Sequence, residues 1–272
     1  MFEGWRADPS VILGVIGAAV FYVAAARRVT AHPTRAGYPT AGQMAAYAGG
    51  LVVLFLALES PLDEWGDEYL FSVHMIQHLL LILVVPPCML GGLTQGMVAP
   101  LFTRLPGRAV LAYLTRPLPA FLLFNGIFSV AHLPNVYDLV LSHEPIHIAE
   151  HILFIASGFC MWWPVAGPYD FNPGLNHPVR IGYLFLQTLP CSAVAALITL
   201  STEAFYVHYT RAERLLPLSV LQDQQIGGLV MWIGMPLYLF GAMSVLFFQW
   251  AASEETSPSV PRLTTEVRLH QP

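Results

Sequence analysis

Long apolar runs separated by short polar segments set the pattern of this chain. They cover about residues 10–27, 43–58, 69–90, 118–132, 146–164, 179–200 and 225–250. The third run contains an unbroken apolar stretch from Leu79 to Val85, which only a lipid-embedded or fully buried helix would carry. Runs of this length with few charges predict transmembrane helices. The pattern therefore predicts an all-α integral membrane bundle of seven transmembrane helices.

The composition supports membrane insertion. The chain is 56% hydrophobic and 11% charged over its 272 residues, with a mean hydropathy of +0.58. A soluble domain carries about 25% charged residues, so this chain has too few to cover a surface that faces water. The three cysteines are scattered within apolar runs and form no CxxC pair, so neither a disulfide framework nor a structural zinc module is expected.

The polar segments between the runs are expected to be loops. The segment around residues 61–68 is acidic, residues 93–117 are basic and are expected to include an amphipathic surface helix, and a second surface helix is expected around 212–221. Residues 135–144 are expected to form a loop. One membrane domain over residues 1–250 is predicted, followed by a polar, disordered cytoplasmic tail at 251–272.

The arginines predict the orientation of the bundle. With seven spans, one side of the membrane holds nine of them: Arg27, Arg28, Arg35, Arg104, Arg108, Arg116, Arg180, Arg262 and Arg268. The other side holds Arg6, Arg211 and Arg214. Because basic residues accumulate in cytoplasmic loops, the N-terminus is expected outside and the C-terminus in the cytoplasm. The residues before the first span lack the basic segment that opens a signal peptide, so this span is expected to stay in the mature protein.

Two histidine pairs open two of the spans. His74 and His78 stand four residues apart, as do His147 and His151, so each pair shares one helix face. His132 ends another span at a matching depth. A lone histidine in a span is commonly a hydrogen-bonded core residue, but two matched pairs favour a metal site. Neutral imidazole is a good ligand for copper, zinc and iron, so these five residues are predicted ligands on the outer face.

Three neighbouring residues are candidates for auxiliary roles. Glu150 precedes His151 and could orient an imidazole through its N–H. Met75 follows His74 and could add a thioether ligand for Cu(I), although packing is the favoured interpretation. Asp223 lies in a polar cluster before the last span, where it could cap and pack helices or give polar support to the site.

These residues resemble a known family. The segments that carry the resemblance are His74-Met75-Ile76-Gln77-His78-Leu79-Leu80 with Pro86-Pro87, Ala131-His132-Leu133-Pro134, His147-Ile148-Ala149-Glu150-His151 with Trp162-Trp163-Pro164, and Asp223-Gln224-Gln225 through Met231-Trp232. Over about residues 5–250 the chain is similar to the CtaG-type cytochrome c oxidase assembly factors. The resemblance implies about seven spans in the bacterial plasma membrane and a role in forming active haem–copper oxidase by helping copper reach it.

Three functions remain open on these grounds. The favoured one is a copper-handling assembly factor that binds Cu(I) or Cu(II) in the imidazole cage and passes it on by ligand exchange, which makes it a metallochaperone of the respiratory chain and not an enzyme. The second is a membrane electron-transfer protein with bis-histidine haem. The third is an intramembrane zinc hydrolase, because His147 to His151 fits the H-x-x-E-H pattern with Glu150 as general base.

The favoured function implies particular partners. These are a subunit of cytochrome c oxidase, a copper donor protein and the lipid bilayer, with no nucleic acid. A homo-oligomer whose protomers share a copper ion is an open alternative.

Overall fold

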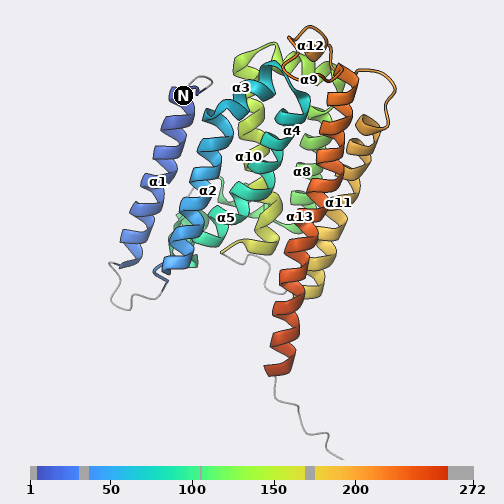
Figure 1. The fold of residues 1–272 in the computed structure, drawn as a ribbon. Helices are drawn as coiled ribbons and strands as arrows, with labels where there is room; N and C mark the ends of the chain where they lie inside the picture. Colours follow the sequence, from blue (N-terminus) through green and yellow to red (C-terminus); the bar gives the residue numbers. More distant parts are fainter. Residues whose placement is uncertain (1–4, 31–36, 105, 169–174, 257–272) are drawn as a thin grey trace, which may run out of the picture.

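The computed structural model (Figure 1) describes residues 5–30, 37–104, 106–168 and 175–256, and the regular structure within these ranges is entirely helical. Six helices there are long and apolar enough to cross a membrane. They are α1 (Pro9–Thr30), α2 (Ala41–Glu59), a rod of α4, η1 and α5 (Phe71–Gly92), α10 (Glu144–Ala166), α11 (His177–Thr199) and α13 (Val220–Thr256). The predicted all-α fold is confirmed, and six of the seven predicted spans have counterparts of spanning length.

The span predicted at 118–132 differs from the other six. Its helix, α8 (Pro117–Ala131), has 15 residues. At 1.5 Å per residue this is about 22 Å, short of the roughly 30 Å hydrocarbon core. Together with α7 (Arg108–Leu114), α8 has the length and apolar character of a membrane span. The two helices are, however, bent by 80° relative to each other. Pro117 starts α8 in its first turn, where its missing N–H costs nothing, and it cannot extend α7.

The third span is irregular because of its two prolines. α4 (Phe71–Leu79) passes through a π-helical turn, η1 (Leu80–Val84), into α5 (Val85–Gly92). Pro86 has no N–H, so the carbonyl of Ile82 loses its helical donor. Trp162 of α10 supplies one instead, with Nε1 donating to that carbonyl at 3.0 Å. Gly158 allows the close crossing, since a Cβ there would lie 3.1 Å from Pro86 Cγ.

Two predicted loops are helical. α3 (Pro61–Glu68) occupies the acidic segment and α9 (Pro134–Leu141) occupies most of 135–144, each with proline in its first turn. The surface helix predicted within 93–117 is confirmed by α6 (Gln95–Arg104) and α7. The one predicted around 212–221 is wrong: α12 (Val207–Thr210) ends before it, and residues 212–219 are not helical. Pro217 lies within that segment and disfavours helical backbone at the residue before it.

The last helix is longer than predicted. α13 continues past Trp250 to Thr256, so residues 251–256 are helical where a disordered tail was expected. A hydrogen bond from Trp250 Nε1 to Glu254 Oε1, at 3.1 Å, joins neighbouring turns of this extension. The remainder of the predicted tail, 257–272, lies outside the described residues.

The core of the bundle lies between its central helices (Figure 1). α11 packs along α13, α13 packs on α4, and α10 packs on both α8 and α5. α1 lies at the edge against α2 and α6, and only 11% of its span is buried. α4 and α10 are therefore the helices best enclosed by protein, and both carry a predicted histidine pair.

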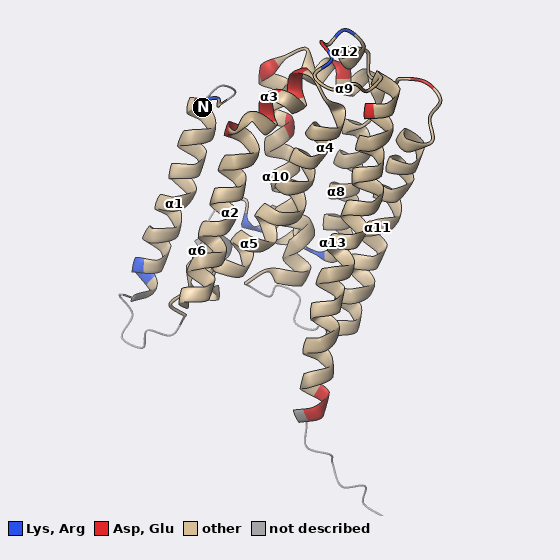
Figure 2. Ribbon diagram, in the orientation of Figure 1, with Lys and Arg blue, Asp and Glu red and all other residues tan. Residues whose placement is uncertain are grey.

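Most carboxylates lie at one end of the bundle, together with a few arginines (Figure 2). Figure 2 shows carboxylates gathered where α3, α9 and α12 lie, which we call the acidic end. Arg27 and Arg28 stand at the other end, in the last turn of α1. The predicted orientation would put the acidic end outside, and the side on which each terminus lies stays a prediction.

Candidate metal centre

Four imidazoles from two helices meet below the acidic end. His74 and His78 come from α4, and His147 and His151 come from α10. One ring nitrogen of each can be chosen so that all four lie within 4.8 Å of one another. Ring centroids are 4.1 and 4.2 Å apart within the two pairs, and 5.4 Å apart for both His74–His147 and His78–His151. The predicted convergence of the two pairs is confirmed, and we call this set the histidine cluster.

Three residues of the histidine cluster are buried and His147 is half-buried. His74, His78 and His151 are 0%, 2% and 8% exposed. Within the described ranges, Nε2 of all four rings lacks a hydrogen-bond partner. A buried polar atom left unpaired costs about 1–3 kcal/mol, so four of them in one place call for a ligand that accepts their lone pairs. A metal ion is such a ligand.

The spacing fits one ion. Imidazole nitrogens bind zinc at about 2.0–2.1 Å, so two ligand atoms on one ion of that size are at most about 4 Å apart. The ring nitrogens of the histidine cluster lie within 4.8 Å of one another, which exceeds that distance by less than about 1 Å. Small rotations of the rings would bring the nitrogens close enough. An imidazole-only donor set suits copper, zinc, iron and nickel.

Asp223 holds the start of α4 in place. Helix α4 has no capping side chain of its own, so its first N–H groups need an outside partner. The carboxylate of Asp223 accepts from Phe71 N at 2.8 Å, from Ser72 N at 3.2 Å and from Ser72 Oγ at 2.5 Å. Asp223 thus caps a helix, but that helix is α4 and not its own helix α13, and polar support for the site stays a prediction. Because His74 follows two residues later, this cap also positions the histidine cluster.

Helix α3 presses against α4 at His74. A Cβ on Gly66 would lie 2.9 Å from His74 Cα, so only glycine allows this approach. Tyr209 Oη donates to the carbonyl of Gly66 at 2.7 Å and lies 2.9 Å from Tyr137 Oη. The ring of Tyr137 in turn meets His74 edge-on, with centroids 5.6 Å apart. Side chains from α9 and α12 thus hold α3 and α4 together over the site.

This packing brings Asp67 into the site. Its Oδ1 lies 3.3 Å from His74 Nδ1 and 3.6 Å from His147 Nε2, so it touches one ring from each pair. Its Oδ2 lies 3.1 Å from Arg6 Nη1, which is also 3.1 Å from Asp63 Oδ2. The contact to His74 is made by Nδ1, so it fixes that ring and leaves Nε2 free to bind a metal.

Asp63 and Asp67 differ in ionisation although they are one turn apart. Burial and the charge of Asp67 raise the pKa of Asp63 to about 7, while Arg6 opposes the shift. Burial would also raise the pKa of Asp67, but the imidazoles of His74 and His147 outweigh it and bring this pKa down to about 2. Asp67 therefore has the lower pKa of the pair.

His132 lies beside the histidine cluster but is not one of its four members. Its Nδ1 lies 2.6 Å from the carbonyl of Phe128, and its buried Nε2 lacks a partner among the described residues. The ring of Phe154 lies between His132 and the histidine cluster, with its centroid 4.6 Å from that of His78 and 6.4 Å from that of His132. Ligation by His132 stays a prediction.

The other two auxiliary candidates lie in the protein interior. Met75 is fully buried in the apolar core, in agreement with the packing role. Glu150 is 7% exposed, and its Oε1 has no hydrogen-bond partner in the described part of the chain. Neither residue belongs to the group of four.

The sequence placed Asp63 and Asp67 in an acidic loop expected to attract cations and Arg6 in a terminal segment, and it named none of the three as a site residue. One signal was present. Asp63 and Asp67 have the same four-residue spacing as the histidine pairs, and Pro61 after Ser60 marks a helix start. What the pattern could not give is that this short helix folds back onto α4.

Comparison with known proteins gives one family and several relatives. The family model described as "Cytochrome c oxidase caa3 assembly factor" matches residues 20–253. An uncharacterized protein of Mycobacterium leprae is 29% identical over 276 residues, covering 93% of this chain and 40% of that protein. One of Mycobacterium bovis is 27% identical over 274 residues, covering 92% and 40%. The chain thus spans well under half the length of these relatives. No solved structure matches it.

Proposed function

Because the chain belongs to the family of cytochrome c oxidase caa3 assembly factors, we propose that it binds a copper ion in the histidine cluster and helps to deliver that ion to cytochrome c oxidase. The ion is cargo, so the protein acts as a metallochaperone and carries out no covalent chemistry. The relatives are bacterial and the helices are of spanning length, which supports a multi-pass protein of the bacterial plasma membrane.

The observation that carries this proposal is the meeting of four imidazoles from α4 and α10, three of them buried and that of His147 half-buried, whose Nε2 atoms have no hydrogen-bond partner among the described residues. Imidazole binds both copper oxidation states, and a cage of neutral donors adds no charge that would hold the ion too firmly. The surrounding carboxylates at the acidic end attract cations from solution. Binding and release then need only exchange of one ligand for another.

Haem ligation has less support. A porphyrin would have to lie between two axial imidazoles, with the iron at its centre. The rings of the histidine cluster instead crowd together, with centroids between 4.1 and 6.1 Å apart. This crowding favours a single ion over a flat macrocycle.

Zinc hydrolysis keeps one favourable observation. Glu150 is buried, lies one residue before His151, and has an Oε1 without a partner among the described residues, as a general base would need. Against it, the four imidazoles would fill the coordination positions of a tetrahedral zinc ion and leave none open for water. We therefore place copper transfer first.

The partners follow from the proposed task. A copper donor protein would supply the ion, and a subunit of cytochrome c oxidase would receive it. A homo-oligomer that shares the ion is less favoured, because one chain already provides four donors.

Metal analysis of the protein purified in mild detergent tests the proposal. We expect about one copper per chain and no strong Soret band, and we expect His74→Ala or His147→Ala to abolish most of the copper and to lower oxidase activity in membranes. His143→Ala is the matched control, since His143 precedes α10 but is exposed and lies outside the histidine cluster. Full copper and full oxidase activity in both cluster variants would overturn the proposal.

A further inference from the structure

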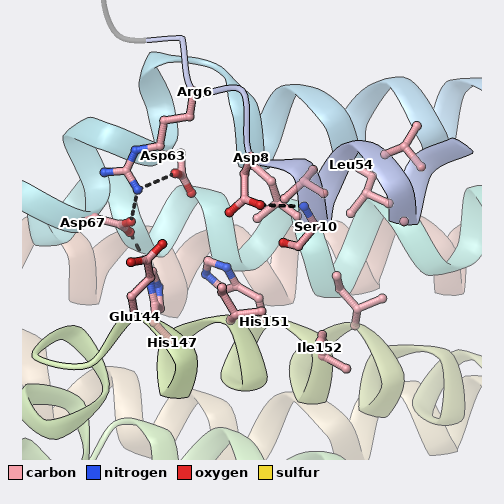
Figure 3. Close-up of a pocket in the computed structure, with 16 residues that line it drawn as sticks. Arg6, Asp8, Ser10, Leu54, Asp63, Asp67, Glu144, His147, His151 and Ile152 are labelled. Atoms are coloured by element: carbon pink, nitrogen blue, oxygen red, sulfur yellow. Dashed lines mark hydrogen bonds and ion pairs between the residues drawn. The ribbon is translucent and has the colours of Figure 1, made fainter.

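A cavity of about 260 Å³ lies against the histidine cluster (Figure 3). It is formed between α1, the end of α2 with α3, and α10. Apolar side chains make its walls: Val11, Val15, Leu54, Leu58, Ile152 and Ile155. Four carboxylates also line it, those of Asp8, Asp63, Asp67 and Glu144, and Asp63 and Asp67 pair with the guanidinium of Arg6.

This cavity reaches the metal donors. His147 and His151 both line it, whereas His74 and His78 lie behind them at 0% and 2% exposure. Figure 3 shows the rings of His147 and His151 on the α10 side of the opening. An ion that moves between solvent and the histidine cluster along this route would meet the α10 pair first.

Arg6 stands in the mouth of the cavity. Its Nη1 lies 3.1 Å from Asp63 and 3.1 Å from Asp67, and its Nη2 lies 3.4 Å from Glu68. Asp67 is the shared partner, because one of its oxygens faces Arg6 and the other faces His74 and His147. A cation that reaches the imidazoles along this side of the cavity would therefore compete with the guanidinium for the same carboxylate.

The segment that carries Arg6 lies outside the core helices. It precedes α1 and is attached to α2 by two bonds to Glu59, from Arg6 N at 3.0 Å and from Asp8 N at 3.3 Å, and by a ring contact between Trp5 and Phe55. The Arg6 side chain is 38% exposed, and α1 itself packs only at the edge of the bundle. Displacement of the guanidinium would leave the core helices in place.

We propose that this cavity is the port through which copper enters and leaves the histidine cluster, and that Arg6 is its electrostatic gate. This inference rests on the proposed function. With Arg6 paired to Asp63 and Asp67, its positive charge repels free cations and keeps Asp67 occupied. When the guanidinium moves out, Asp67 is free to guide the ion to His147 and His74.

The charge of the gate is tested by the rate of copper uptake. Purified, metal-free protein takes Cu(I) from a coloured chelator complex, and the colour change is followed in time. Arg6→Gln should speed uptake about fivefold to tenfold at low ionic strength, and added salt should shrink the difference, because removing the cation deepens the negative potential of the mouth. Arg6→Lys should stay near the wild-type rate. Arg211→Gln is the matched control, removing one exposed arginine from a different cavity of the acidic end.

The position of the port is tested independently on α1. Gly14 lines the cavity, and a Cβ added there meets nothing within 4 Å, so Gly14→Phe can place a ring in the opening. We expect slower uptake and unchanged copper per chain at equilibrium. Gly17→Phe is the matched control, because Gly17 has equally open surroundings on the same helix but does not line the cavity.

The outcomes separate the two proposals. If wild-type protein takes up no copper, the proposed function fails and the port with it. If it takes up copper but Arg6→Gln and Gly14→Phe match their controls, the histidine cluster stands and the port is wrong. Faster uptake in the first variant and slower uptake in the second would establish both the gate and its location.

Discussion

Glu150 is the residue at which copper transfer and zinc hydrolysis make opposite predictions. Its carboxyl is buried beside the histidine cluster, and its neutral amide counterpart has almost the same shape. In copper transfer the carboxylate would at most orient a ring, and loss of such a partner typically lowers metal affinity about tenfold or more. With copper supplied at about ten times the dissociation constant of the variant or above, Glu150→Gln should therefore retain at least about half of the bound metal. In hydrolysis the same change would leave the metal bound and remove turnover.

Metal content and hydrolysis of a general peptide substrate would be measured on the same Glu150→Gln preparation. We expect no hydrolysis by the wild type, and therefore none to lose. Measurable wild-type hydrolysis that disappears in the variant, with metal retained, would favour the enzyme.

At the scale of single residues, the sequence predicted the histidine pairs because a helix has a fixed period. Four-residue spacing alone places two rings on one face, whatever the helix packs against. Asp67 could not be predicted in the same way, because its role depends on α3 folding onto α4 at Gly66. His132 shows the opposite case, since a matching depth along the chain did not bring its ring into the group of four.

At the scale of elements, α4 depends on a cap from a distant helix. Asp223→Ala would leave the N–H groups of Phe71 and Ser72 without an acceptor in a buried place. Hydrogen bonds to a charged group are worth about 1.5–3 kcal/mol each, so we expect a loss of about 3 kcal/mol in unfolding free energy together with weaker copper binding.

Thermal unfolding in detergent and copper titration would measure both effects of Asp223→Ala. Ser219→Ala is the control, since Ser219 Oγ accepts from Gln222 N at the exposed start of the same helix. It should cost about 1 kcal/mol and leave copper binding unchanged. Equal effects on copper from the two variants would contradict the role of Asp223 in positioning α4.

The element boundaries show what local sequence rules can and cannot give. Long apolar runs predicted six spans, because length and composition are read directly from the chain. The bend between α7 and α8 could not be predicted from hydropathy, which sees an apolar segment but not its direction. Loops were expected where the structure has the helices α3 and α9, although a proline in the first turn of each was a usable signal for a helix start.

At the scale of the whole molecule, the site depends on one contact between distant segments, the packing of α10 against the rod formed by α4, η1 and α5. Two residues of α10 make this crossing close: Trp162 donates a hydrogen bond to the carbonyl of Ile82, and Gly158 has no side chain to clash with Pro86. The sequence shows each of these residues but not that they face one another. The convergence of the pairs was therefore a hypothesis until the helices were placed.

Orientation is the whole-molecule property that the proposal needs, since copper is to be exchanged at the outer face. One cysteine introduced in place of Glu213, which is exposed and follows α12 by three residues, should react with a membrane-impermeant maleimide on intact spheroplasts. A cysteine at Arg28, exposed at the other end, should react only after lysis. The unmodified chain, with its three partly or fully buried cysteines, is the control. The reverse labelling pattern would place the acidic end in the cytoplasm.

The most direct measurement is X-ray absorption at the copper edge, on purified protein loaded with one equivalent of copper. The account predicts a first shell of nitrogen only, at about 2.0 Å, with the outer-shell scattering of several imidazole rings, and loss of that pattern in His74→Ala. A sulfur shell, or copper that washes away from the wild type, would contradict binding by the histidine cluster.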